Sequence, residues 1–386
     1  KSFFKFLSFE GFFYLLGALG GIIIARLYGV EFRGLLAEYR LYGGVLFAIF
    51  FSGYKLNLLS KFNSKNYIEL LNLNTYSVLL LSTLICIPLL IFGNFAGYDF
   101  ILIVAVIFHA TLFCIIDYNH ALITSLRKIK YAYVLLISPI FLYVTTIFLF
   151  KNFLNKHSIL VYILPFLYQG IIIFIIATYK NFLKKIQIKK LGLNIKNAFS
   201  YVPYYGTIAV VSYLPGLFLI NDTAQLAFFS VAHSLTIPLL KIPRIVGNFS
   251  FFDFKRTDKK VFDKFVLYTM IIMILLAFTF FFISDYIIIL LFSEKFALSS
   301  MPFKILVLSL PLTVLISRME SKFFTENKKN TSVIVVLLSL SVFIPLFFKQ
   351  NLNAVTISIF FSIYRLIMTM LFLIFTIRTF KIKFNF

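Results

Sequence analysis

The sequence predicts an all-α, polytopic membrane protein with about twelve transmembrane helices. Apolar residues make up 61% of its 386 positions and charged residues only 13%, whereas soluble domains contain about 45–50% and roughly 25%. The mean hydropathy is +0.97. Along the whole chain the apolar residues form stretches of about 20 residues, the length that crosses a bilayer. These observations exclude a soluble or disordered protein and place the function inside the membrane.

A window of about 19 residues separates the apolar stretches into individual spans. We expect helices at approximately 7–29, 35–56, 76–95, 100–123, 131–150, 158–179, 198–220, 225–245, 265–290, 302–323, 331–348 and 355–377. The first span is longer than the apolar core of a signal peptide, so we expect it to be retained.

Basic residues lie mainly on one side of these spans. With a cytoplasmic amino terminus, the outer loops contain scattered cations, and the inner segments contain clusters at 55–65, 127–130, 180–196, 255–264, 328–329 and 378–383. The inner excess is on the order of four to one, as the positive-inside rule requires. We therefore expect both termini in the cytoplasm. We attribute the net charge of +23 to basic residues that set the topology and contact anionic lipid headgroups, and not to nucleic-acid binding.

Two halves of six spans each are indicated by the order of spans and loops. Residues 27–48 and 220–241 each contain the end of a span, a short outer loop and the start of the next span. The longest polar linker follows the sixth span. We expect an N-terminal lobe at 1–180, a basic cytoplasmic linker at 181–197 and a C-terminal lobe at 198–386, with pseudo-symmetric lobes around a central cavity.

Glycine and proline interrupt the first span of each half. The first span contains Gly17, Gly20 and Gly21, and the seventh contains Pro203 and Pro215. Interrupted helices at matching positions of two repeats are typical of transporters, so we predict hinges at these residues. Taken singly, each of them is explained as well by close packing of neighbouring helices.

Arginine residues inside the predicted spans are the main candidates for a binding site. Arg365 lies about 15 Å from either end of its span, and an arginine at mid-bilayer costs about 2.5–3.5 kcal/mol. Arg40 and Arg26 lie nearer the ends of their spans, where snorkelling to the surface is the alternative explanation. Together with His233, these residues predict a cationic cavity that binds an anion, because guanidinium groups suit phosphate oxygens.

Two carboxylates, Glu10 and Glu38, are candidates for ion coupling because they lie within or beside predicted spans. His109 is also intramembrane, but a single buried histidine is more often a hydrogen-bonded packing residue than a ligand or a proton relay.

Other function classes lack their usual motifs. The sequence contains no G-x-x-x-x-G-K-[ST] phosphate loop, and its short outer loops hold no metal-ligand spacing or catalytic triad. Cys86 and Cys114 lie in apolar runs and are explained as small core residues. We therefore expect a transporter that is not an enzyme and has no cofactor and no bound metal.

The run at residues 24–37 resembles the first-loop motif of polysaccharide exporters in the multidrug/oligosaccharidyl-lipid/polysaccharide (MOP) exporter superfamily. The matching residues, in order, are Ala25, Arg26, Leu27, Gly29, Glu31, Arg33 and Gly34. The run departs from the family pattern at Tyr28 and Val30. Segments 227–240 and 287–296 are similar to the corresponding parts of the second half, where the family often has glycine in place of Ser293.

This resemblance implies a flippase of the O-antigen or capsule type in the bacterial cytoplasmic (inner) membrane. Such a protein moves an undecaprenyl-pyrophosphate-linked oligosaccharide to the outer leaflet by alternating access, and the pyrophosphate would be the anion. Arg26 and Arg33 are the substrate-binding positions carried over from the motif. The implied partners are this lipid-linked oligosaccharide, membrane lipids, a polysaccharide polymerase and other assembly proteins, and we expect a monomer.

Three alternatives remain open from the sequence. A peptidoglycan-precursor flippase would have the same fold. A drug or cation exporter of this fold would be expected to have an acidic cavity. An integral-membrane polysaccharide polymerase or ligase would be expected to have a larger outer loop with charged residues.

Overall fold

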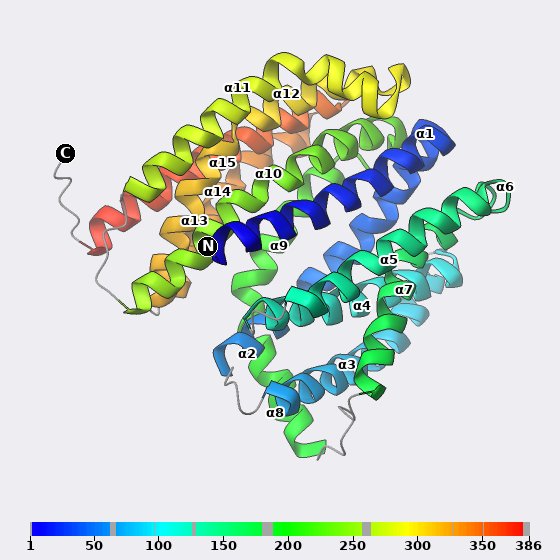
Figure 1. The fold of residues 1–386 in the computed structure, drawn as a ribbon, viewed down its shortest axis with the longest axis horizontal. Helices are drawn as coiled ribbons and strands as arrows, with labels where there is room; N and C mark the ends of the chain where they lie inside the picture. Colours follow the sequence, from blue (N-terminus) through cyan, green and yellow to red (C-terminus); the bar gives the residue numbers. More distant parts are fainter. Residues whose placement is uncertain are drawn as a thin grey trace. The chain divides into compact units, whose positions relative to one another are not determined.

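The computed structural model describes residues 2–61, 67–95, 97–125, 129–179, 188–256, 264–326, 328–349 and 351–380. These ranges are helices joined by short turns, and they contain no strand (Figure 1). In parts of them, such as 2–17 and 248–256, only the backbone is described. The predicted all-α fold is confirmed.

The helices follow the predicted spans, and each of the twelve predicted ranges overlaps at least one helix. In chain order they are α1 (Ser2–Phe50), α2 (Tyr54–Lys61), α3 (Tyr67–Phe95), α4 (Phe100–Ser125), α5 (Ile129–Leu149), α6 (Lys151–Leu154), α7 (Ser158–Tyr179), α8 (Ile188–Phe199), α9 (Val202–Leu217), α10 (Thr223–Arg256), α11 (Lys264–Phe292), the 3₁₀ helix η1 (Glu294–Ser299), α12 (Ser300–Leu308), α13 (Leu310–Thr325), α14 (Lys329–Ser339), the 3₁₀ helix η2 (Leu340–Phe348) and α15 (Ala354–Phe380).

Within the described ranges, six helical segments are long and apolar enough to cross a bilayer. They are Glu69–Gly93, Phe100–Asn119, Thr223–Leu240, Lys264–Phe292, Asn330–Phe348 and Ala354–Phe380. The bent pair Glu294–Leu308 and Leu310–Phe323 would form a seventh span.

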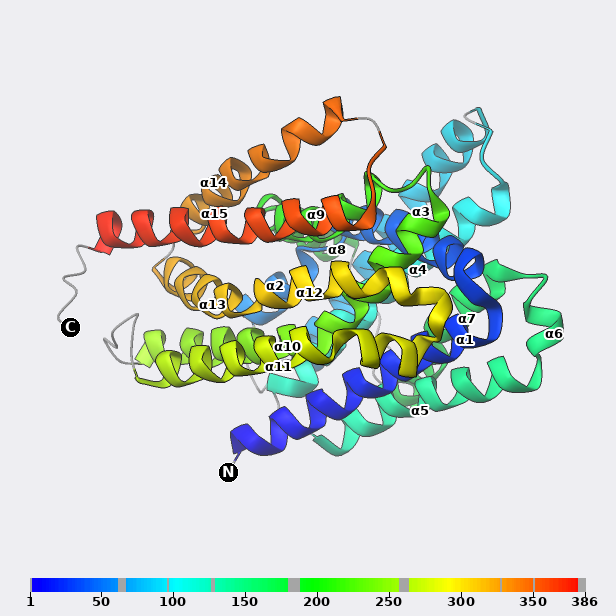
Figure 2. The ribbon, with the colours of Figure 1, turned by 90° about the horizontal axis from the view of Figure 1, so that it is seen from above.

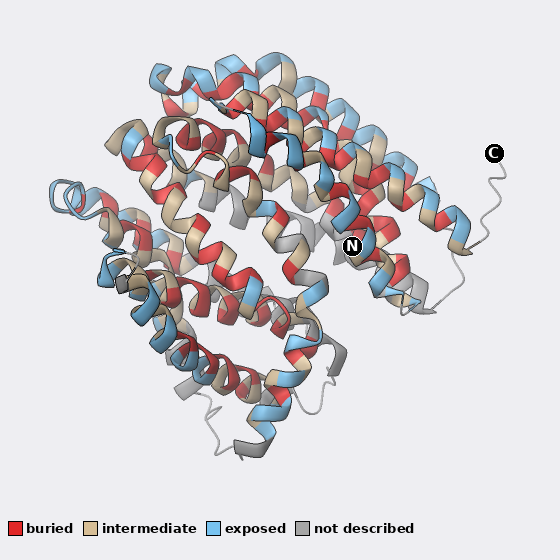
Figure 3. Cartoon of the chain, turned by 180° about the vertical axis from the view of Figure 1, so that it is seen from behind, coloured by how far each residue is buried: buried red, intermediate tan, exposed pale blue. Residues whose placement is uncertain are grey.

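Many positions on the outer faces of these helices are exposed (Figure 3), and a large share of them are large apolar residues. Phe282 is 75% exposed and Phe92 is 71% exposed. Contiguous apolar surface of this kind is unfavourable in water and suits lipid. The chain is therefore a multi-pass membrane protein.

Two breaks interrupt the helices where the sequence disfavours an α-helix. In α1, Gly29 has φ 86° and ψ −169°, a conformation that is essentially restricted to glycine. This break lies at the predicted end of the first span; below, residues 2–28 of α1 are called the first limb. Between α12 and α13 the direction changes by 42° at Ser309. Pro311 has no N–H to donate to the carbonyl of Val307, so the helical ladder cannot continue there.

The chain forms two compact units. Unit 1 consists of Lys1–Gly34 and Leu214–Phe386, and unit 2 consists of Leu35–Tyr213. The sequence-based division into lobes at 1–180 and 198–386 differs from these units, because unit 1 contains the first limb and unit 2 contains most of α9. The pseudo-symmetry of the lobes and their central cavity stay predictions.

Unit 2 has an apolar core and a buried amide network. The core joins side chains of α1, α3 and α4, such as Phe47, Val78 and Ile107. In the network, Asn57 Nδ2 donates to Asn194 Oδ1 at 2.7 Å, and Asn194 Nδ2 donates to Asn74 Oδ1 at 2.9 Å. These three asparagines belong to α2, α8 and α3 and are at most 2% exposed. Because buried amides are stable only when paired, the network fixes α8 to the rest of the unit.

In unit 1, α10, α11, α12, α13 and α15 pack against one another (Figure 2). The buried residues of α11 include small ones, such as Ala277 and Ser284, which allow close helix packing. The wide exposed face of α11 consists mainly of Leu, Ile, Phe and Tyr residues. The helix is thus buried on one stripe and lipid-facing on the rest.

Candidate functional site

A cluster of polar and aromatic residues surrounds Arg40 inside unit 2. The side chain of Arg40 interacts electrostatically with His109 of α4 and Tyr162 of α7. His109 and Tyr162 are 5% and 1% exposed, and His109 Nδ1 is hydrogen-bonded to the Tyr162 hydroxyl. The Tyr39 ring lies 5.6 Å from the Tyr162 ring, and the Tyr39 hydroxyl lies 3.4 Å from Ser158 Oγ. This Arg40 cluster therefore combines one guanidinium with several hydroxyl groups.

Two adjacent glycines make room for the Arg40 cluster. A Cβ on Gly43 would overlap the His109 ring and lie 2.6 Å from the Tyr162 hydroxyl oxygen. A Cβ on Gly44 would overlap the ring of Tyr213 in α9. The backbone of α1 thus approaches three aromatic side chains at a distance that only glycine permits.

Arg365 lies in the interior of unit 1, as its predicted depth suggests, and is 5% exposed. Its Nη1 donates to Ser309 Oγ at 2.7 Å and to the Leu306 carbonyl at 3.3 Å. Both acceptors lie at the break between α12 and α13. A cation is favourable here, because the end of α12 carries partial negative charge. Arg365 therefore stabilises the broken helix in addition to any role in binding an anion.

The ring of Phe361 links Arg365 to His233. The guanidinium carbon of Arg365 lies 4.6 Å from the Phe361 ring centroid, and the His233 ring centroid lies 6.1 Å from the same centroid, edge to face. His233 is also stacked on Phe229 at 5.8 Å. Two of the predicted site residues thus meet in unit 1 through one aromatic ring.

The two arginines of the first-loop motif make contacts within unit 1. Arg26 is exposed and donates to the carbonyls of Leu290 and Leu291 at the end of α11. Arg33 is 1% exposed, and its Nη2 would lie 3.6 Å from a Cβ on Gly21. Arg33 and the predicted hinge residue Gly21 are therefore in contact across the Gly29 break.

The remaining predicted residues are distributed over both units. Glu38 Oε1 accepts a hydrogen bond from the Tyr42 hydroxyl at 3.0 Å in unit 2. The side chain of Glu10 lies outside the described residues, as does the environment of Gly17, and Gly20 is buried in the first limb. Pro215 is buried next to the point where the chain returns to unit 1, whereas Pro203 is exposed in α9. The assignment of roles to these residues stays a prediction.

Sequence reasoning missed two charged residues of α13. Arg318 is 1% exposed, and Glu320 interacts electrostatically with Tyr364, the neighbour of Arg365. The sequence contained a sign of them, because three charges fall near the inner end of the predicted span 302–323. His109 was explained by packing alone. Arg40 is 69 positions away along the chain, so no local sequence pattern indicates that the two residues lie close together.

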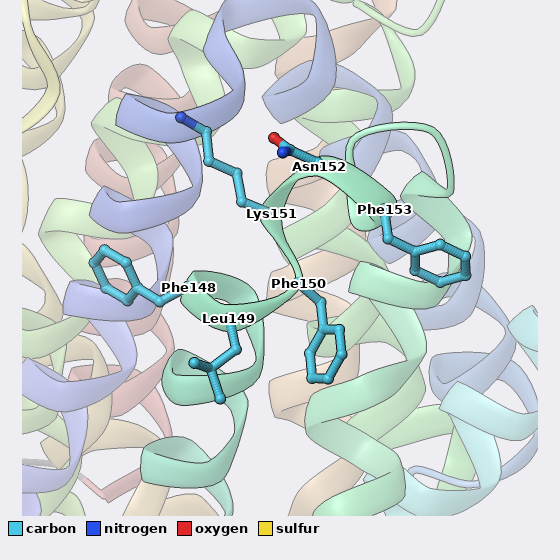
Figure 4. Close-up of a pocket in the computed structure, with 6 residues that line it drawn as sticks. All are labelled: Phe148, Leu149, Phe150, Lys151, Asn152 and Phe153. Carbon is cyan, nitrogen blue, oxygen red and sulfur yellow. The ribbon is translucent and has the colours of Figure 1, made fainter.

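A shallow hollow at the junction of α5 and α6 has no connection with these residues. It is lined by Phe148, Leu149, Phe150, Lys151, Asn152 and Phe153 (Figure 4). Its phenylalanines are more than half exposed. Aromatic residues beside a lysine at the end of a span are typical of the membrane interface. In the part of the chain that is described, no group of His, Cys, Asp or Glu is arranged to hold a metal.

Comparison with solved structures identifies proteins of similar fold. Neither the family models nor the curated proteins include a match to the sequence. Among solved structures, the lipid II flippase MurJ in an inward-closed conformation aligns with 98% of this chain and 87% of its own, with a TM-score of 0.68 and 15% identity. An inward-facing multidrug resistance MATE family transporter of the MOP superfamily aligns with 96% of this chain and 95% of its own, with a TM-score of 0.66 and 13% identity.

A third similar structure is the eukaryotic MATE transporter AtDTX14, with a TM-score of 0.58, 14% identity, and coverage of 98% of this chain and 96% of its own. The three alignments extend over nearly the whole chain and include one flippase and two MATE transporters. The chain therefore has the fold of MOP superfamily transporters.

Proposed function

We propose that this protein is a flippase that moves an undecaprenyl-pyrophosphate-linked oligosaccharide, an O-antigen or capsule repeat unit, across the bacterial cytoplasmic membrane by alternating access. The observation that carries the proposal is the buried guanidinium of Arg365 in a chain whose whole length is similar in fold to a lipid flippase. Charge inside a membrane protein is costly and is usually retained for function.

The chemistry of the two clusters supports an anionic cargo. Arg40 interacts electrostatically with the hydroxyl of Tyr162, and Arg365 donates a hydrogen bond to the hydroxyl of Ser309. Guanidinium forks and hydroxyl groups are the usual donors to phosphate oxygens. A hydrophobic cation, the cargo expected of a drug exporter, would be repelled by both clusters. An anionic, lipid-linked headgroup is therefore favoured over a cationic drug.

The membrane potential favours this direction of transport. A headgroup with two negative charges that moves outward across the whole field gains about 4.6 kcal/mol per 100 mV, at roughly 2.3 kcal/mol for each charge. Such a flippase needs no ATP-binding motif. Coupling to a proton or sodium ion through Glu38 or Glu10 would add to this driving force.

A peptidoglycan-precursor flippase is the second candidate, because the lipid II flippase MurJ is among the similar structures. Its cargo, a lipid, would meet the same cationic clusters. The two functions differ in what the cell loses. Loss of a peptidoglycan-precursor flippase stops wall synthesis and is lethal, whereas loss of an O-antigen or capsule flippase removes a surface polymer.

Depletion of the protein in its native host distinguishes these functions. We expect viable cells that lack a surface polysaccharide and accumulate its lipid-linked repeat unit on the inner leaflet. Lysis with accumulation of peptidoglycan precursor would support the second candidate. Unchanged polymer and normal growth, together with higher sensitivity to cationic drugs, would contradict both.

A further inference from the structure

The side chain of Arg26 joins the first limb to the end of α11. Arg26 Nε donates to the Leu291 carbonyl at 2.8 Å, and Nη2 donates to the Leu290 carbonyl. The last four carbonyls of a helix have no helical partner and carry partial negative charge. One guanidinium satisfies two of them at once because its donors form a planar fork. Arg26 is thus already engaged by groups of the protein.

The chain just after the Gly29 break also contacts other helices of unit 1. Gly34 lies so close to Thr223, the first residue of α10, that a Cβ would overlap the Thr223 carbonyl oxygen. Beside it, Gln225 Oε1 accepts a hydrogen bond from the backbone N–H of Ala354 at 2.9 Å, which joins the starts of α10 and α15. The chain on both sides of the Gly29 break therefore lies near the end of α11 and the starts of α10 and α15.

These contacts explain why the first limb belongs to unit 1. Residues 1–34 are separated from the rest of that unit along the chain by all of Leu35–Tyr213. Gly34 contacts α10 from the far side of the Gly29 break, at the point where the chain leaves the unit. Two hydrogen bonds from the Arg26 side chain hold the first limb to the end of α11.

We propose that Arg26 is a positioning residue that acts as a latch between the first limb and α11, and that a phosphate group of the cargo opens it. This proposal rests on the proposed function for the nature of the cargo. The guanidinium is exposed, so a phosphate oxygen can reach it. A charged oxygen forms a stronger hydrogen bond with guanidinium than a neutral carbonyl does. The anion would therefore replace the carbonyls of Leu290 and Leu291 and free the first limb.

Release of the first limb is a population shift between two states. A ligand that binds the open latch more tightly than the closed one moves the protein toward the open state by its difference in affinity. Arg26 would then have two successive partners, the end of α11 in the empty protein and the headgroup in the loaded one.

Amide hydrogen exchange of the purified protein without cargo tests the latch independently of transport. In Arg26→Gln, we expect exchange in residues 22–34 to rise about tenfold, because the local opening equilibrium loses two hydrogen bonds. In Arg26→Lys the increase should be smaller, since an ammonium keeps the charge without the fork. Lys295→Gln is the matched control, because Lys295 is an exposed cation just beyond α11, and its exchange should equal that of the unmodified protein.

Inorganic pyrophosphate is the probe for opening by an anion. It should raise exchange in the same segment of the unmodified protein and leave Arg26→Gln without further change. Exchange in Arg26→Gln within about twofold of the unmodified protein would overturn the latch. An unchanged pattern with pyrophosphate, when Arg26→Gln does accelerate exchange, would overturn opening by phosphate while leaving the latch in place. Neither result depends on whether the protein proves to be a flippase.

Discussion

Replacing Ser293 by glycine should stabilise the protein. Ser293 joins α11 to η1 with φ 88° and ψ 167°, and Gly29 has nearly the same conformation. A side chain in this region costs about 1–3 kcal/mol. Glycine also loses more chain entropy on folding, by about 0.4–1 kcal/mol. The net gain for Ser293→Gly is therefore about 0.5–2 kcal/mol, since the serine side chain makes no capping hydrogen bond that would be lost.

Thermal unfolding in detergent, followed by circular dichroism at the helix band, measures this gain. For a chain longer than 250 residues, about 2 °C per kcal/mol predicts a rise in Tm of roughly 1–4 °C. Ser293→Ala is the matched control, because it removes the hydroxyl and keeps the side chain, and its Tm should stay within about 1 °C. A lower Tm for Ser293→Gly would refute the assignment of strain to this residue. This reasoning also explains why the exporters that the sequence resembles often have glycine here.

Three further substitutions test the packing and the buried charges. Asn194→Ala should lower the stability by about 2–4 kcal/mol, because buried amide groups of Asn57 and Asn74 lose their partner; thermal unfolding measures this, and an unchanged Tm would contradict the amide network. Gly43→Ala should lower it by about 1–3 kcal/mol through overlap with the His109 ring, whereas a stability equal to that of the unmodified protein would contradict the close approach of α1. Arg365→Gln should reduce surface polysaccharide at normal protein levels at least about tenfold, which corresponds to about 1.4 kcal/mol in transport. Ser309→Ala keeps the charge of Arg365 and should retain most of the polysaccharide. Equal amounts of polysaccharide in the two variants would contradict a role for Arg365 in binding the anion.

The sequence was sufficient to predict the helices, because each span carries its own signal. Mean hydropathy marks the apolar stretches, and Gly29 marks the end of the first span by its backbone freedom. The break at Ser309 was not predicted. Pro311 alone does not indicate it, because proline is common in membrane helices and need not break them. Local patterns therefore predicted where helices lie and were less reliable on where they bend.

The candidate site was predicted in part. Depth along the span placed Arg365 in the interior correctly, because a long apolar span leaves its central residue no route to water. The same argument could not find the partner of Arg26, since the α11 carbonyls are 264 and 265 residues away along the chain. The division into units is likewise invisible locally. It depends on contacts such as that between Gly34 and Thr223, which join distant parts of the sequence.

The most direct test of the central claim is transbilayer movement of defined lipids by the purified protein in proteoliposomes. Two lipids are assayed, a polyprenyl-pyrophosphate-linked oligosaccharide and a peptidoglycan precursor. A fluorescent hydrophobic cation is the comparison, and each compound is assayed with a potential applied across the membrane. We predict movement of the linked oligosaccharide at least about tenfold above that in protein-free vesicles, with loss of this activity in Arg40→Gln and Arg365→Gln variants that remain folded. Movement of the cation alone, or activity of the two arginine variants equal to that of the unmodified protein, would contradict a flippase that recognises its cargo through the guanidinium groups of Arg40 and Arg365.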